Sequence, residues 1–340
     1  MKRRPRVRSA LVVAALGLGL VSRDAGAETP PSVWDRARDP DAAAAHDLHE
    51  RVQHRLIPTA VHEVNDAEIR TARAMLLEAH ADTSRHVFLR FDLAHVYSAL
   101  KEYARAAAIL KSIIAEFPDD ASLERAWERL ANACGHIGDH ACEREAYIHE
   151  LRFETEEVSR AVPTLNLAET QMHLGELKDA IEGYREAIRI AARLSGLHRE
   201  VPPLATWGLA VALDRAGDRL GAEKEARFAL ELQRSMGMPT LLRDPDVVYF
   251  FPEYEIHWYE GLGAAARARV ASSSREASAL WRQAERSFGE YVKAGEPKND
   301  RWLPIAKARL AQAKAERERT EKAGAKEPPP SPATDHEIRL

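Results

Sequence analysis

Cysteine, long apolar runs and excess basic charge are all scarce in this sequence. Only two of the 340 residues are cysteine, so the chain can form at most one internal disulfide. The apolar run Ala10–Val21 has twelve residues, well short of the roughly 20 that cross a bilayer as a helix. The formal net charge is −4, whereas nucleic-acid binding needs a concentrated basic face. These absences argue against a membrane-spanning protein and against a nucleic-acid partner.

The first 27 residues have the order of a secretory signal peptide. Five basic residues among the first eight precede the apolar run, and Ala25-Gly26-Ala27 offers a small-residue cleavage site. We therefore expect residues 1–27 to be removed, so that the mature chain starts at Glu28 and is exported to a periplasm. Secretion, or anchoring by an uncleaved signal, is the alternative. Cleavage moves the net charge to −9 and leaves no segment for stable membrane insertion.

Composition changes at both ends of the mature chain. Residues 28–43 contain three prolines and little periodic apolar content, which predicts an exposed linker. Residues 321–340 are rich in proline, lysine and glutamate, and the few apolar residues there predict a disordered tail. Residues 44–320 have helical periodicity throughout and no convincing period-two alternation, so we expect a single all-helical domain.

Four segments of that domain repeat one pattern. Each has a Leu-Ala step or a close variant in a first apolar helix, then a turn, then a second helix, as in LNLAETQMHLGELKDAIEGYREAIRI. Three of the turns contain Gly-Asp or Gly-Glu, at residues 138–139, 175–176 and 217–218. The best-matched units are 87–120, 124–157, 161–194 and 203–236, and they recur every 37 to 42 residues.

This pattern resembles the tetratricopeptide repeat (TPR), a helix-turn-helix unit of 34 residues. The matching positions are Leu93, Ala94, Tyr97, Ala106, Leu110 and Pro118 in the first unit; Trp127, Leu130 and Ala131 in the second; Leu167, Ala168, Gly175, Ala180, Tyr184 and Ala187 in the third; and Leu209, Ala210, Gly217, Ala222, Ala226 and Ala229 in the fourth. The resemblance implies an all-α fold, a right-handed α-solenoid of antiparallel helix pairs.

Both cysteines lie in the stretch CGHIGDHAC, residues 134–142. In the repeat register, Cys134 ends a first helix and Cys142 begins a second helix, which favours a disulfide across the hairpin. Two buried unpaired cysteines, or a zinc or copper site with His136 and His140, are the alternatives. Residues two apart on a helix point about 200° from each other, so four convergent ligands would require the helix ends to unwind.

Signs of catalysis are also missing. The sequence has no glycine-rich phosphate loop, no nucleophile elbow and no recognisable pair of catalytic carboxylates. His46, Glu50 and His54 recur every four residues, but a solvated polar face explains that spacing. We expect no enzyme activity, catalytic residue, cofactor or metal.

The resemblance implies instead that the first helices line a concave groove for a protein or peptide partner. Residues mapped to this groove are Phe91, His95, Glu128, Asn132, His136, Leu165, Glu169, His173, Trp207, Val211 and Arg215. Phe91 and Trp207 are expected to anchor the two ends of an extended ligand. The favoured function is an adaptor or scaffold of the cell envelope. A structural subunit of an envelope assembly or secretion complex is the alternative, a metal-binding or enzymatic protein ranks below both, and the oligomeric state stays open.

Overall fold

The structure, a computed structural model, describes residues 33–58, 64–193, 198–244 and 247–326. Those residues form fourteen α-helices joined by turns and short 3-10 helices, and they include no strand. In chain order the helices are α1 (Val33–Arg38), α2 (Pro40–Leu56), α3 (Asp66–Glu78), α4 (Val87–Ala99), α5 (Tyr103–Glu116), α6 (Leu123–His136), α7 (His140–Phe153), α8 (Ala161–Leu174), α9 (Leu177–Ala191), α10 (Val201–Arg215), α11 (Arg219–Ser235), α12 (Ile256–Ala268), α13 (Ser274–Gly295) and α14 (Leu303–Gly324).

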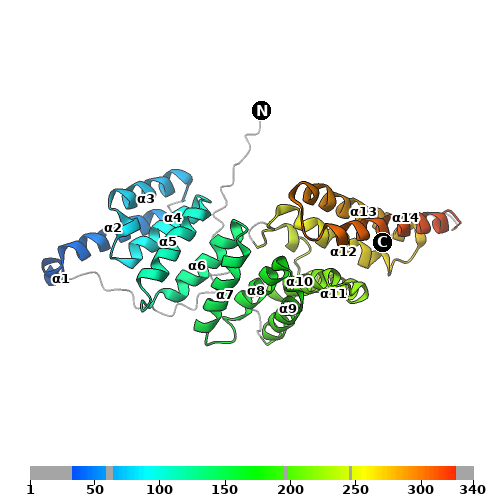
Figure 1. Cartoon of the computed structure of the whole chain (residues 1–340), viewed down its shortest axis with the longest axis horizontal. Helices are drawn as coiled ribbons and strands as arrows, with labels where there is room; N and C mark the ends of the chain where they lie inside the picture. The colour runs from blue at the N-terminus through cyan, green and yellow to red at the C-terminus, as the bar shows by residue number, and fades with distance from the viewer. Residues whose placement is uncertain (1–32, 59–63, 194–197, 245–246, 327–340) are drawn as a thin grey trace, which may run out of the picture.

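Successive helices pack against each other in sequence order, which is the architecture of an α-solenoid. The four units expected from the sequence are the hairpins α4–α5, α6–α7, α8–α9 and α10–α11. Figure 1 shows these hairpins side by side along the long axis of the molecule, with α1 at one end and α14 at the other. The chain therefore has a TPR-like fold of antiparallel helix pairs, and that prediction is confirmed.

The Gly-Asp dipeptides end one helix and start the next. Gly138 and Gly217 have φ angles of 71° and 94°, in the left-handed region where glycine avoids the steric penalty of a side chain. The following aspartates cap the second helices: Asp139 Oδ1 accepts from the Cys142 amide at 3.2 Å, and Asp218 Oδ1 accepts from the Gly221 amide at 2.9 Å. Two local residue choices thus fix where each hairpin turns.

The buried side chains form two clusters along the solenoid. One runs from α2 to α7, and the other runs from α8 to α14. Small alanines at the helix contacts, such as Ala106, Ala168 and Ala210, allow close approach. The second cluster also buries large aromatic rings, including Trp258, Phe288 and Tyr291. The C-terminal half is therefore built around a heavier aromatic core.

The expected boundaries need correction at both ends. The linker expected over residues 28–43 contains α1, and α2 begins at Pro40, where the Asp39 side chain accepts from the Ala42 amide. α14 continues to Gly324, past the boundary expected at residue 320. The signal peptide expected at 1–27 and residues 327–340 of the tail lie outside the described residues. Among the helices that the structure describes, none is both long and apolar enough to span a bilayer.

Candidate functional site

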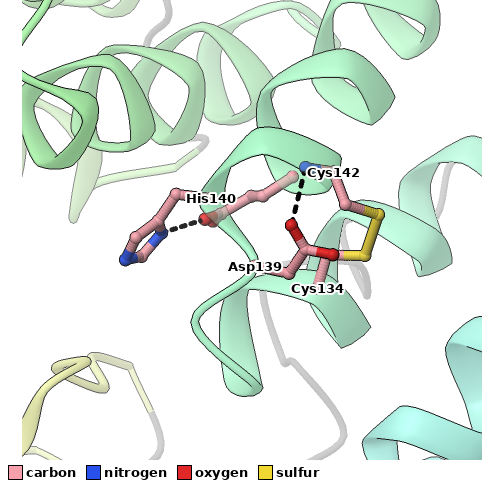
Figure 2. The surroundings of a disulfide bond; sticks show 5 residues. Cys134, Asp139, His140 and Cys142 are labelled. Carbon is pink, nitrogen blue, oxygen red and sulfur yellow. Dashed lines mark hydrogen bonds and ion pairs between the residues drawn. A yellow bond between two sulfur atoms is a disulfide. The ribbon is translucent and has the colours of Figure 1, made fainter.

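A disulfide joins the two helices of the second well-matched hairpin. Cys134 at the end of α6 is bonded to Cys142 at the start of α7, as Figure 2 shows. The Cα atoms of the two cysteines are 5.9 Å apart. The predicted disulfide is confirmed, and neither cysteine is free. In the described chain, Cys134, Asp139 and Cys142 are the one group of three potential metal ligands within 4.8 Å of one another, and the disulfide uses both sulfurs.

The same turn presents two histidines to other parts of the chain. His136 is stacked between Tyr103 and Tyr249, with ring centroids 4.0 Å away on each side. Tyr103 belongs to the preceding hairpin, whereas Tyr249 lies more than 100 residues further along the chain. His136 therefore connects the repeat surface to an irregular segment that follows α11.

His140 makes the corresponding contacts on the other side of the turn. Its ring stacks on His173 of α8 at 4.6 Å and meets the edge of Phe251 at 6.1 Å. Its Nδ1 lies 2.8 Å from Glu143 Oε2, an interaction that orients the imidazole ring (Figure 2). A Cβ atom on Gly138 would lie 2.0 Å from the Phe251 ring, so only glycine allows this approach. We call His136, His140, Glu143, Glu169 and His173 the central cluster.

Three members of the central cluster have strongly perturbed pKa values. Burial, assisted by the Lys101 charge, lowers the pKa of His136 to about 4. Burial and the Arg215 charge lower the pKa of His173 well below its ordinary value. Burial and two nearby carboxylates raise the pKa of Glu169 to about 8. Near pH 7 these three side chains are mainly neutral, so they offer hydrogen bonds and flat rings rather than charge.

A pocket of about 380 Å³ opens beside the central cluster. His140 and His173 form one wall, and residues 298–302, between α13 and α14, form another. Arg301 Nη1 donates to the main-chain oxygen of His173 at 3.3 Å across 128 positions of sequence. This contact brings the start of the last helix against the middle of the solenoid.

At the C-terminal end of the expected groove, three residues are buried instead of lining an open surface. Trp207 is 2 % exposed, and its indole N–H donates to Gln233 Oε1 at 3.1 Å. Val211 is completely buried. Arg215 is paired with Glu255 at 2.6 Å. The expectation of a ligand anchor at Trp207 is therefore wrong, because α12 and α14 pack over α10 and cover this part of the face.

Arg215 is enclosed by aromatic rings as well as by its ion pair. Its guanidinium lies 4.6 Å from the Trp258 ring centre and 4.8 Å from the Trp302 ring centre. Next to it, the Asp214 carboxylate accepts from Trp258 Nε1 and from Arg309. These contacts join α10, α12 and α14 into one unit.

The N-terminal part of the expected groove is more open. Glu128 is exposed, whereas His95, Asn132, His136, Glu169 and His173 are partly exposed. Phe91 and Leu165 are nevertheless buried, each only 6 % exposed, so the expectation that Phe91 anchors a ligand is also wrong. Arg125 and Arg129 cover Phe91, with their guanidinium carbons 5.8 and 5.7 Å from the ring centre.

His95 belongs to this N-terminal part and differs from an ordinary surface histidine. Burial and the charges of Arg129 and Arg125 lower the pKa of His95 to about 4. The imidazole is therefore neutral near pH 7, beside two guanidinium groups that carry charge. This end of the face combines hydrogen-bonding side chains with positive charge.

The repeat positions alone did not identify four residues that belong to the central cluster or contact it: Glu143, Tyr249, Phe251 and Arg301. Glu143 occupies a second-helix position where the repeat normally has a small residue, which is a usable signal. Tyr249 and Phe251 come from the connection after α11, and Arg301 comes from the turn before α14. No repeat pattern assigns those two segments to the surface of α6–α8.

No protein-family model matches the sequence, and no curated protein matches it. Among solved structures, the chain is similar to a signal-transduction ATPase with numerous domains and a TPR sensor from Pyrococcus horikoshii: 14% identity, 84% of this chain and 45% of that chain covered, TM-score 0.49. It is also similar to BtubC from P. vanneervenii, with 15% identity, 71% and 96% covered, and TM-score 0.36.

A third similar structure is the TPR2AB domain of yeast Sti1 in complex with pHSP90, with 14% identity, 80% and 99% covered, and TM-score 0.27. The chain spans less than half the length of the ATPase. At these identities the likeness concerns the fold alone. The TPR-like architecture described above rests on the helix pairs and turns of this chain.

Proposed function

We propose that this protein is a non-catalytic adaptor that binds an extended segment of a partner protein along the face formed by α4, α6 and α8. One observation carries the proposal: this face already holds an irregular segment of its own chain. Tyr249 stacks on His136, and Phe251 packs on His140 and Gly138. A surface that accepts two aromatic side chains two residues apart has the shape and chemistry for a peptide segment.

The partner would lie on the part of the face that this internal segment leaves open. His95 and Asn132 are partly exposed there. Arg125 and Arg129 beside them have no ion-pair partner among the described residues, so their charge is available to a ligand. A neutral imidazole, an amide and two charged guanidinium groups together favour a polar segment with acidic and aromatic side chains.

Site-specific photo-crosslinking tests this proposal. A photoreactive residue is placed at His95 or Asn132, and the matched control carries it at Lys111, which is exposed on α5. The mature protein is irradiated in an extract of its native cells. We expect one partner to be captured from both positions on the face and not from the control. Equal capture from all three positions, or capture from the control alone, would contradict the proposal.

We further propose that the protein acts outside the cytoplasm, in the periplasm or a secreted fraction. The basic residues, apolar run and small-residue cleavage pattern of residues 1–27 support this location, and a disulfide is stable in an oxidising compartment. Cell fractionation with an antibody against the mature chain tests it. A product that stays in the cytoplasm with residues 1–27 attached would contradict it.

A structural subunit of a larger assembly is the second candidate function. α11 exposes Leu220 and Phe228, with 81% and 47% of their surface accessible. Apolar side chains of this size on an outer helix are suited to a permanent contact. Light scattering of the purified protein separates the two candidates, because an adaptor is expected to be monodisperse alone.

A further inference from the structure

Four glutamates meet at the end of the α6–α7 hairpin opposite the central cluster. Glu124 and Glu128 lie in the first half of α6, Glu150 lies in the last turn of α7, and Glu154 is the C-cap of α7. We call these four residues the acidic site. α6 has fourteen residues and is therefore about 20 Å long, which separates this site from His136.

Glu150 makes this group more than a surface patch of negative charge. The residue is 6 % exposed, and its Oε2 atom has no hydrogen-bond partner in the described structure. Burial and the charges of Glu128, Glu154 and Glu124 raise its pKa to about 8. Burial and the charge of Glu124 also raise the pKa of Glu154. Leaving a buried carboxyl oxygen unpartnered is unfavourable, so a donor that reached it would be stabilised.

The basic residues nearest the site are directed elsewhere. Arg160 Nη1 donates to the main-chain oxygens of Leu151 and Glu154 at 2.7 and 3.1 Å and not to a carboxylate. Arg125 and Arg129 of α6 turn toward Phe91. No carboxylate of the acidic site takes part in an ion pair between described residues. The C-terminal end of a helix is itself negative, so the last turn of α7 adds to the unbalanced charge.

We propose that the acidic site binds a cationic side chain, arginine or lysine, of a partner protein. This inference names the chemistry of the partner and so rests on the proposed adaptor function. One buried carboxyl group with an unpartnered oxygen, together with three more exposed carboxylates, suits a long side chain with a charged end. Arginine presents several N–H donors in one plane and can bond more than one carboxylate at once.

A divalent metal ion fits the arrangement less well. Calcium gathers oxygen ligands at 2.3–2.6 Å, so ligand oxygens around one ion lie close together. Within the described ranges, no three carboxylates of the acidic site have oxygen atoms within 4.8 Å of one another. This chain also neutralises glutamate with arginine elsewhere, as where Glu157 contacts Arg189 and Arg193 at 3.0 and 2.8 Å.

Calorimetric titration with a hexa-arginine peptide tests the inference on the mature chain. Glu150→Gln keeps the shape of the side chain and removes its charge, and Glu231→Gln makes the same change on the exposed surface of α11. We expect Glu150→Gln to weaken binding about tenfold or more and Glu231→Gln to change it less than about twofold. Glu150→Asp, which keeps the charge, should retain most of the affinity. Circular dichroism checks that all variants remain folded.

Proton release supplies a readout that a purely structural role would not change. Binding a cation favours the ionised form of Glu150, so at pH 7 the wild-type chain should release about one proton per peptide. The measured heat then depends on the ionisation enthalpy of the buffer, and Glu150→Gln should remove that dependence.

Several results would overturn the inference: no binding of the peptide, equal losses in Glu150→Gln and Glu231→Gln, or wild-type affinity in Glu150→Gln. Displacement of the peptide by calcium, with calcium binding lost in Glu150→Gln, would reassign the site to a metal ion. Crosslinking from His95 and Asn132 can succeed in each of these cases. The adaptor proposal is therefore tested independently of the acidic site.

Discussion

Replacing Arg215 with methionine should destabilise the C-terminal half of the solenoid. The change removes the partner of Glu255, which is only 1 % exposed, and breaking a buried ion pair costs about 3–5 kcal/mol. Two Arg215 nitrogens, Nε and Nη1, have no hydrogen-bond partner among the described residues, so their removal offsets on the order of 1–2 kcal/mol. Methionine keeps most of the contact with the Trp258 and Trp302 rings. The net loss should therefore be about 1–4 kcal/mol.

Urea unfolding followed by tryptophan fluorescence measures this loss, because Trp258 and Trp302 report on the affected region. The double variant Arg215→Met with Glu255→Gln also removes the charge left behind, and it should recover to within about 1 kcal/mol of wild type. If Arg215→Met, in which Glu255 has lost its ion-pair partner, is as stable as wild type, the reasoning is refuted. Arg215 would then be a surface contact, as the repeat register predicts.

The pH dependence of the single variant gives an independent check. Burial already raises the pKa of Glu255 although Arg215 opposes the shift, and removing Arg215 raises it further. An acid whose pKa is raised in the folded state loses stability as pH rises from its unfolded pKa, near 4.3, to its folded pKa. The deficit of Arg215→Met should thus be small near pH 4 and largest above neutral pH.

Two further predictions concern the turn between α6 and α7. Changing Cys134 and Cys142 to alanine together should lower the free energy of unfolding by about 2.5 kcal/mol in the chain-entropy model without changing the helical content, as measured by urea titration and circular dichroism. Two alkylated thiols in the non-reduced wild-type protein would contradict the disulfide. His136→Phe keeps a ring between its two tyrosines but removes a titrating group whose pKa is lowered to about 4. As pH falls from 6.5 to 4, the unfolded state binds this proton before the folded state does, so wild type should lose stability in that window. The slope of the free energy of unfolding against pH should be shallower for His136→Phe by up to about 1.4 kcal/mol per pH unit. An unchanged slope would show that His136 is exposed in solution.

The sequence alone determined the helix pairs and their turns, and it favoured the disulfide over free cysteines or a metal site. Each of these depends on residues close together in the chain: Gly138 and Asp139 end one helix and cap the next, and the two cysteines are eight positions apart. The Leu-Ala pattern describes contacts within a hairpin and between neighbouring hairpins, which recur at a regular spacing. The all-α repeat architecture could therefore be predicted without coordinates.

Only the tertiary structure decided which first-helix residues remain accessible. Trp207 and Arg215 occupy the same repeat positions as residues on the open face, yet α12 and α14 cover them through contacts such as Arg215–Glu255 and Asp214–Arg309, 40 and 95 positions apart. Tyr249 likewise reaches His136 from a segment outside the repeats. Repeat periodicity determines how each hairpin packs against its neighbours. The long-range contacts depend instead on the small rotations between repeats, which add up along the solenoid, and on side chains that lie far apart in the sequence and share no repeat pattern.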